Sequence, residues 1–282
     1  MKRGKVTIDS VLDGEFRIGP EICYPDIPAD RWDKYEHLLT DKREIVNQLG
    51  GYLLRSDDYV ALIDVGFGPT QGVGDWQTGE FLNSLDALGV KPEDVTDVLF
   101  THLHFDHIGW ASVEGDPVFA NATYRCHEQD WAHFTGADYV DLPEMLGPGI
   151  DNFPADMTAQ AKLGPIADRM KLWSGVETLL PGLDAVEFPG HTPGTSALRL
   201  TSDGETAWFI GDIAHHQGEL VEPDIRFLVN MDQAAAAASQ EQLLAELVPQ
   251  GVPFVAAHFR DFEWGRVEQT DDGLAWQRID EE

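Results

Sequence analysis

The sequence predicts an α/β fold in which strands and helices alternate along the chain and pack in layers. Short apolar runs typical of strands alternate with stretches of helical apolar spacing, and Gly, Pro and Asp separate them. No internal repeat or low-complexity tract interrupts this order. The chain has 282 residues, 43% of them hydrophobic, which suffices for one domain with a full core. We therefore expect a single domain over residues 1–282.

The first half of the chain predicts four strands and one helix. Two strands are expected over 49–54 and 59–64, joined by the polar turn 55–58. A helix is expected over 78–88, because its apolar residues recur at helical spacing and Gly89 follows. Residues 95–100 and 123–126 are typical of two further strands. Cys126, in the second of these, is expected to be a buried structural thiol, and two cysteines are too few for a disulfide framework.

The second half continues the alternation. A strand is expected over 185–188, and a hairpin over 197–200 and 206–210 around the turn 202–205. Asp232 is a good N-cap for a helix that runs through the alanines to Leu247. Residues 252–256 predict the last strand.

Two segments fit the core pattern poorly. Residues 20–47 are polar and contain three prolines, so we expect a loop followed by helix within an N-terminal extension, 1–47. Residues 137–178 are rich in Gly, Pro and Met and predict an insertion of loops and short helices. Such an insertion forms a lid, a subunit contact or a plain surface excursion.

The formal net charge of −31 bears on the possible partners. A surface this negative repels phosphate backbones and anionic lipid, so we expect neither nucleic-acid nor membrane partners, and a neutral small-molecule substrate. Solubility or a salty environment is a better explanation of the charge than steering of the substrate. No apolar run reaches the roughly 18 residues of a membrane span, and the N-terminus lacks a signal-peptide core. We therefore expect a cytoplasmic protein.

The stretch 101–107, Thr-His-Leu-His-Phe-Asp-His, carries the strongest chemical signal. Histidine and aspartate are preferred ligands of zinc and similar divalent metals. Further on, other His and Asp residues also follow strand-like runs, and strand ends are where an α/β fold brings distant residues together. The predicted metal ligands are His102, His104, Asp106, His107, His191, Asp212 and His258.

The remaining histidines carry a weaker signal. His37, His127 and His133 lie in apparent helices and are expected to be surface or packing residues. His215 and His216 closely follow Asp212, and His215 is the better candidate to face the site.

With these motifs in this order, the sequence resembles the metallo-β-lactamase superfamily over roughly residues 48–260. The HxHxDH motif is His102 to His107, and the later motifs match His191, Asp212 and His258. The resemblance implies an αββα sandwich with two zinc ions at one sheet edge. It assigns His102, His104 and His191 to the first metal, Asp106, His107 and His258 to the second, and Asp212 to a bridge. Asp64 matches an aspartate that supports the ligands, or it is only a turn residue before glycine.

Two such metals can share a hydroxide and lower its pKa towards neutrality, so that it attacks an acyl carbon or a phosphorus. Asp106 can orient this nucleophile and pass a proton to the leaving group. No Gly-Xaa-Ser-Xaa-Gly motif is present, in agreement with a reaction that needs no serine nucleophile.

Several branches of the superfamily fit poorly. The classical β-lactamases lack a carboxylate at the position of Asp212, and glyoxalases of the hydroxyacylglutathione type carry a basic C-terminal helical domain. The tRNA-processing nucleases need a basic surface. The sequence is most similar to the lactonases and the methyl-parathion-hydrolase-like enzymes. It departs from the acyl-homoserine lactonases at His215, where they commonly place a tyrosine that holds the substrate carbonyl.

We therefore expect a metal-dependent hydrolase with two Zn²⁺ per chain that opens lactones or cleaves activated esters, with Asp106 and His215 as catalytic residues. An organophosphate triesterase and a mono-iron oxidoreductase of the persulfide dioxygenase type remain alternatives. The substrate is expected to be apolar and to lie under a lid. The resemblance also suggests a homodimer, with 20–47 and 137–178 as contacts. The lid residues are expected to be Met145, Phe153, Met157 and Trp173.

Overall fold

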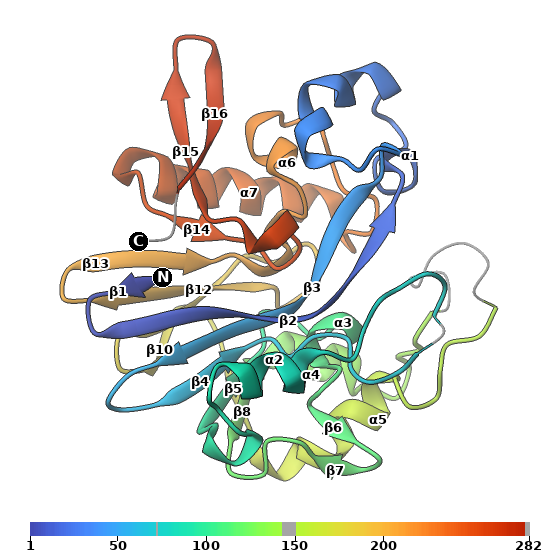
Figure 1. Cartoon of the computed structure of the whole chain (residues 1–282), viewed down its shortest axis with the longest axis vertical. Coiled ribbons are helices and arrows are strands. Elements are labelled where there is room, and N and C mark those ends of the chain that lie inside the picture. Colours follow the sequence, from blue (N-terminus) through green and yellow to red (C-terminus); the bar gives the residue numbers. More distant parts are fainter. Residues whose placement is uncertain (72, 143–150, 280–282) are drawn as a thin grey trace.

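The chain folds into two β-sheets packed face to face, with helices on both outer faces (Figure 1). The computed structural model describes residues 1–71, 73–142 and 151–279. One apolar cluster lies between the sheets and contains Leu54, Ile63 and Leu198. Two further clusters lie between each sheet and its helices. These three cores separate four layers, so the predicted α/β fold with an αββα sandwich is confirmed.

The first sheet contains the N-terminal strands. Its first four strands are antiparallel, and the last three add in parallel. In spatial order they are β1 (Lys2–Arg3), β2 (Val6–Ile18), β3 (Ile45–Arg55), β4 (Val60–Ile63), β5 (Asp97–Leu99), β8 (Thr123–His127) and β9 (Met170–Trp173).

The second sheet follows in chain order. Only β13 and β14 pair in parallel. Its strands are β10 (Glu177–Leu180), β11 (Leu183–Glu187), β12 (Ser196–Ser202), β13 (Glu205–Phe209), β14 (Phe254–Val255), β15 (Gly265–Thr270) and β16 (Gly273–Arg278). A separate two-stranded ribbon joins β6 (Ser112–Val113) to β7 (Asp116–Pro117).

Helices cover the two outer faces. The first sheet packs against α2 (Phe81–Ala87), α4 (Glu128–Phe134) and α5 (Ala159–Leu163), and α3 (Phe105–Ile108) follows β5. The second sheet packs against α6 (Gln217–Val221) and α7 (Gln233–Leu247). The N-terminal helix α1 (Pro20–Cys23) is followed by a 3-10 helix, Ala29–Leu38. Shorter 3-10 turns span Pro92–Asp94, Gly164–Arg169, Gly211–Ile213, Val248–Gln250 and Arg260–Phe262.

The apolar runs of the central strands reflect burial on both faces. Leu62 of β4 points into the cluster under the helices, whereas Ala61 and Ile63 point between the sheets. The expected strands of the central region are therefore present within a few residues of their predicted bounds. The expected helix 232–247 is also present, and the Asp232 carboxylate accepts hydrogen bonds from Ala234 N (3.0 Å) and Ala235 N (2.9 Å).

Two expectations need correction, and one hairpin was not expected. The segment 1–47 is not only an extension, because it supplies β1, β2 and the start of β3 to the first sheet. The insertion 137–178 includes β9 and the start of β10, which are the edge strands of the two sheets. The hairpin of β15 and β16 was not expected at all. In each case the strand lies at a sheet edge or is half exposed, and its polar residues interrupt the alternation of apolar residues by which a strand is recognised.

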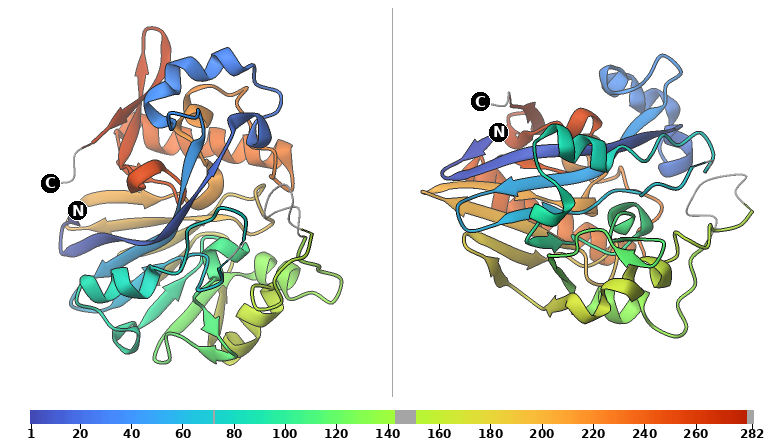
Figure 2. Two further views of the ribbon diagram at one scale, coloured as in Figure 1. Left: turned by 45° about the vertical axis from the view of Figure 1, so that its right-hand side comes forward. Right: turned by 60° about the horizontal axis from the view of Figure 1, so that its bottom comes forward.

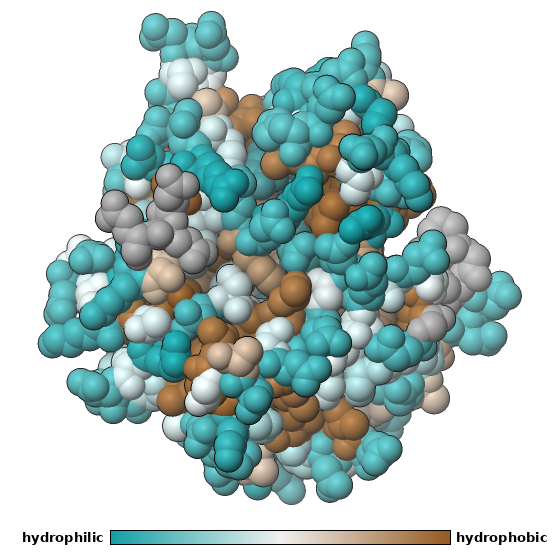
Figure 3. Space-filling view, viewed as in Figure 1, coloured by the Kyte–Doolittle hydropathy of each residue, from teal (hydrophilic) through white to brown (hydrophobic). Residues whose placement is uncertain are grey.

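Residues 20–39 pack against the segment that follows β13, on the same side of the molecule in both views of Figure 2. Tyr35 lies edge-on to the His216 ring, and Arg31 pairs with Glu222 and Asp224. Hydrophilic side chains cover most of the face in Figure 3. Among the described residues, no helix has the length and apolar character needed to cross a membrane.

Candidate metal centre

All seven predicted metal ligands meet at one edge of the two sheets. His102 and His104 lie in the loop after β5, and Asp106 and His107 lie on the single turn of α3. The other three follow β11, β13 and β14 of the second sheet: His191, Asp212 and His258. Strands that end at one edge place distant residues side by side.

The first group of ligands consists of three imidazoles. The His104 Nδ1 atom lies 3.0 Å from His102 Nε2 and 2.9 Å from His191 Nε2. All three side chains are buried. Their ligand atoms are close enough to hold one metal ion.

A second group lies beside the first. His107 Nε2 is 3.8 Å from Asp106 Oδ1, and His258 Nε2 is 3.5 Å from Asp106 Oδ2. These three side chains also satisfy the spacing of a metal site. Asp106 is the most exposed of the three, with 12% of its side chain accessible, so it is the member of this group that solvent reaches most easily.

Asp212 lies between the two groups. Its Oδ2 atom is 3.7 Å from His102 Nε2 and 3.4 Å from His191 Nε2 of the first group. The same oxygen is 3.5 Å from His107 Nε2 and 3.2 Å from His258 Nε2 of the second group. One buried carboxylate oxygen therefore faces both groups, which is the position of a bridging ligand.

Unpaired buried atoms and the low pKa values of the first group fit bound metal. In the second group, burial opposes protonation of His107, but the carboxylates of Asp212 and Asp64 outweigh it and raise the pKa of His107 well above its usual value. His107 Nε2 and Asp212 Oδ1 are buried without a hydrogen-bond partner in the described part of the chain. Burial lowers the pKa of His102 and His104 well below the usual value, and that of His191 to about 3. Neutral imidazoles keep the lone pairs that bind metal. The nitrogen and oxygen donors therefore form a dinuclear site for divalent metal ions.

Hydrogen bonds from outside the ligand set orient the imidazoles. The Asp64 carboxylate accepts from Thr101 N (2.8 Å), Thr101 Oγ1 (2.7 Å) and His107 Nδ1 (2.9 Å). Asp64 has φ of +56°, so it is a turn residue and a supporting residue at once. His258 Nδ1 lies 2.8 Å from the Gln48 carbonyl oxygen, and His191 Nδ1 lies 3.2 Å from Asn230 Oδ1. No local pattern in the sequence pointed to Gln48 or Asn230.

His215 lies in the site. Its Nε2 atom is 3.1 Å from Asp212 Oδ2, and its ring stacks on Phe227 at a centroid distance of 3.6 Å. Burial alone would lower the pKa of His215, but the carboxylates of Asp212 and Glu219 outweigh it and raise the pKa to about 9. Glu219 Oε1 also accepts hydrogen bonds from His215 N (2.7 Å) and Tyr24 Oη (2.8 Å). Sequence reasoning missed this buried glutamate.

The other histidines lie outside the ligand set. His216 caps α6 and contacts Trp32 and Tyr35 edge-on. His127 ends β8 and caps α4, with Nε2 3.1 Å from Glu187 Oε2, so it is a buried cap and not a residue within a helix. His133 packs edge-on against Phe134, as expected of a packing residue.

The expected lid residues have different positions. Phe153 packs edge-on against Phe105 at 5.5 Å, beside the ligand turn. Met157 is buried in the same apolar cluster. Trp173 is buried between the sheets, so its assignment to a lid was wrong. Met145 lies outside the described residues.

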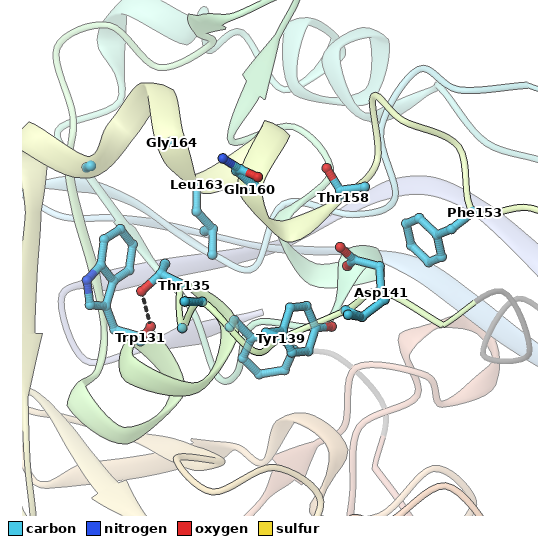
Figure 4. A pocket seen from close by; sticks show the side chains of 14 residues that line it. Trp131, Thr135, Tyr139, Asp141, Phe153, Thr158, Gln160, Leu163 and Gly164 are labelled. Atoms are coloured by element: carbon cyan, nitrogen blue, oxygen red, sulfur yellow. Dashed lines mark hydrogen bonds between the residues drawn. The ribbon is translucent and has the colours of Figure 1, made fainter.

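A pocket of about 610 Å³ lies on the helical side of the first sheet, and Figure 4 shows the side chains that line it. It lies between α4 with its following segment and α5, and Trp131, Tyr139 and Leu163 are among the residues that line it. Phe134 forms part of the wall and lies edge-on to the His104 ring at 5.5 Å. The pocket therefore borders the metal centre through one aromatic side chain.

The chain and its fold are similar to known proteins. The chain is 25% identical over 223 residues to an N-acyl homoserine lactonase of Bacillus cereus, covering 72% of this chain and 78% of that protein. The structure resembles the dizinc quorum-quenching lactonase AidC, with a TM-score of 0.86, 22% identity, and coverage of 100% and 97%. It also resembles the hydrolase AbOPH, with a TM-score of 0.81, 24% identity and the same coverages.

The sequence of residues 51–258 matches the family model described as the metallo-beta-lactamase superfamily. That span is 208 of the 282 residues and contains every ligand of both groups. The chain belongs to the metallo-β-lactamase superfamily, as one of its metal-dependent hydrolases.

Proposed function

We propose that this protein is a dinuclear zinc hydrolase that opens lactones or cleaves activated esters. The observation that carries the proposal is the position of Asp212 Oδ2, which lies 3.2–3.7 Å from imidazole nitrogens of both ligand groups. Two of the proteins that are similar to this chain are named N-acyl homoserine lactonases, so lactones are the first substrates to test. The negative surface favours neutral molecules over nucleic acid.

We assign His102, His104 and His191 to the first zinc ion, Asp106, His107 and His258 to the second, and Asp212 to both. Histidine nitrogen and carboxylate oxygen are ordinary zinc ligands, and five imidazoles favour zinc over calcium or magnesium. Bound there, the ions supply Lewis-acid activation of water and of a carbonyl oxygen.

The residues around the ions perform the remaining steps. The Asp106 carboxylate, the most accessible of the second group, accepts a proton from the attacking water and returns it to the leaving oxygen. The His215 ring, held by Phe227 and Asp212, donates a hydrogen bond to the substrate carbonyl oxygen. This contact favours the developing negative charge of the transition state.

The pocket beside His104 suits the apolar part of a substrate. Its wall combines aromatic and aliphatic side chains with a few polar groups, as is usual for small-molecule sites. We place an acyl or aryl group there, with the scissile bond at the metal centre.

Metal analysis followed by a substrate panel tests the function. We expect two zinc ions per chain and turnover of lactones or aryl esters in preference to aryl phosphotriesters and thioesters. We expect His215→Ala to lower kcat/KM for the preferred substrate about 10-fold or more, equivalent to about 1.4 kcal/mol. A preference for phosphotriesters would indicate the triesterase alternative. One iron per chain with oxygen consumption would overturn the hydrolase.

Gln160→Trp tests the pocket, because Gln160 lines it and is exposed, so the larger ring fills space without disturbing the core. We expect KM to rise more for long-chain than for short-chain substrates. Gln129→Trp, at an exposed position of α4 that does not line the pocket, serves as the matched control. Equal effects on all chain lengths would contradict the placement.

The predicted homodimer has support in the insertion. Val140, Leu142, Leu172 and Val176 are large apolar side chains with 46–68% of their surface exposed. Light scattering of the purified protein measures the oligomeric state, and a monomer at micromolar concentration would contradict the dimer.

A further inference from the structure

A buried carboxylate on α4 connects the two loops that carry the first ligand group. Asp130 lies in the first turn of α4 and is fully buried. Its Oδ2 accepts hydrogen bonds from Leu103 N (3.2 Å) and Thr192 Oγ1 (2.9 Å), and its Oδ1 accepts one from Gly194 N (2.6 Å). It contacts no ligand side chain through these bonds.

The hydrogen-bond partners of Asp130 lie next to the histidines of the first group in the chain. Leu103 lies between His102 and His104, and Thr192 directly follows His191. The first loop follows β5 of one sheet, and the second joins β11 to β12 of the other sheet. The carboxylate therefore spans the two sheets at the point where the three imidazoles converge.

The loop after β5 and the loop between β11 and β12 come so close together that a hydrogen-bonded group between them is needed to hold them in place. His104 Nδ1 lies 3.0 Å from His102 Nε2 and 2.9 Å from His191 Nε2, so the lone pairs that these nitrogens must present to one metal ion repel each other until the ion is bound. The loop at 194 also approaches α4 so closely that a Cβ at Gly194 would lie 2.8 Å from Asp130 N and from His127 Nδ1. The backbone at Gly194 is thus in direct contact with the start of α4.

We propose that Asp130 is a positioning residue for the first metal site, which holds the loop of His102 and His104 at the correct distance from the loop of His191. The affinity of the first site for metal then depends on Asp130, and the affinity of the second site does not. This inference rests on the ligand assignment proposed above and is independent of the substrate.

Zinc titration of metal-free protein against a chromophoric chelator tests the inference. Asp130→Asn keeps the size but leaves Leu103 N or Gly194 N facing an amide group that cannot accept. We expect it to weaken the first site about 10- to 100-fold, as is usual for groups that orient metal ligands. Glu128→Gln removes the same charge from an exposed position in the same turn and is expected to leave both sites unchanged.

Thr192 provides a second variant pair should Asp130→Asn fail to fold. Thr192→Val removes the hydroxyl donor with little change in shape and is expected to weaken the same site, whereas Thr192→Ser is expected to restore it. Adding His258→Ala to Asp130→Asn identifies the metal that remains. We expect the double variant to lose that metal, because His258 belongs to the second group.

The outcomes separate the two proposals. Failure of the wild-type protein to bind two zinc ions would count against the ligand assignment itself. If the wild type binds two and Asp130→Asn matches it, or weakens both sites equally, Asp130 does not position the first site. A lower unfolding temperature with unchanged zinc affinity would show a structural role only and would also overturn the inference.

Discussion

Replacing Asp64 with asparagine perturbs the second metal site through one hydrogen bond. The Asp64 carboxylate accepts two hydrogen bonds from Thr101 and one from His107 Nδ1. If the asparagine oxygen keeps the bond from Thr101 N, its amide group faces the Thr101 hydroxyl, which can accept, and the His107 ring. To bind metal through Nε2, His107 must carry its proton on Nδ1, where it would then meet another donor.

The cost of this arrangement sets the expected effect. A buried donor without an acceptor costs about 1–3 kcal/mol. Without metal, His107 can move its proton to Nε2 and accept from the asparagine amide, so the cost falls mainly on the metal-bound state. At about 1.4 kcal/mol per tenfold change, the affinity of the second site is expected to fall about 10- to 100-fold.

Competition with a chromophoric zinc chelator measures this loss. We expect Asp64→Asn to retain one zinc ion at free-zinc concentrations where the wild type retains two. Asp58→Asn, at an exposed position of the turn before β4, removes the same charge and is the control. A second-site affinity within threefold of the wild type would refute the reasoning, as would an equal loss at both sites.

Three further predictions concern stability and reactivity. The Asp13 carboxylate is fully buried and accepts hydrogen bonds from four backbone N–H groups and the Trp110 indole. Asp13→Asn is therefore expected to lower the free energy of unfolding by about 2–6 kcal/mol, measured by urea unfolding of the metal-free protein. A change under about 1 kcal/mol would contradict this expectation. Burial raises the pKa of the Cys23 thiol to about 12 and that of Cys126 well above its usual value, so both stay protonated at pH 8. Reagents that react with thiolates should then label the two cysteines only after the protein unfolds. Rapid labelling of the native protein would contradict this prediction. Asp232→Ala removes the cap of α7 and is expected to cost about 1 kcal/mol, a fall in Tm of roughly 2–4 °C by calorimetry; an unchanged Tm would show that the cap contributes little.

Much of the metal centre could be predicted from the sequence because its signal is local. Each ligand follows a short apolar run, and a reader needs only a few neighbouring residues to recognise a strand end. The αββα sandwich required the motifs in their order, since alternating strands and helices alone are compatible with several layered folds.

The edges of the sheets could not be predicted in the same way. The strand β2 buries Val6, Ile8 and Val11, but Asp9 and Ser10 interrupt the alternation and a register shift lies between Leu12 and Gly14. Trp173 resembled a lid residue because its neighbours are polar and irregular. It is core because β9 pairs with β8, a contact between segments far apart in the chain.

By itself the sequence determined the superfamily and the layered fold, and it predicted which residues are the metal ligands. Only the tertiary structure revealed the hydrogen-bond partners of these residues and their loops, such as Asn230 for His191, Gln48 for His258 and Asp130 for Thr192. These partners lie 39, 210 and 62 positions away from the residues they contact. Spacing rules describe one strand or one helix at a time, whereas a hydrogen bond across two sheets exists only once both sheets have packed.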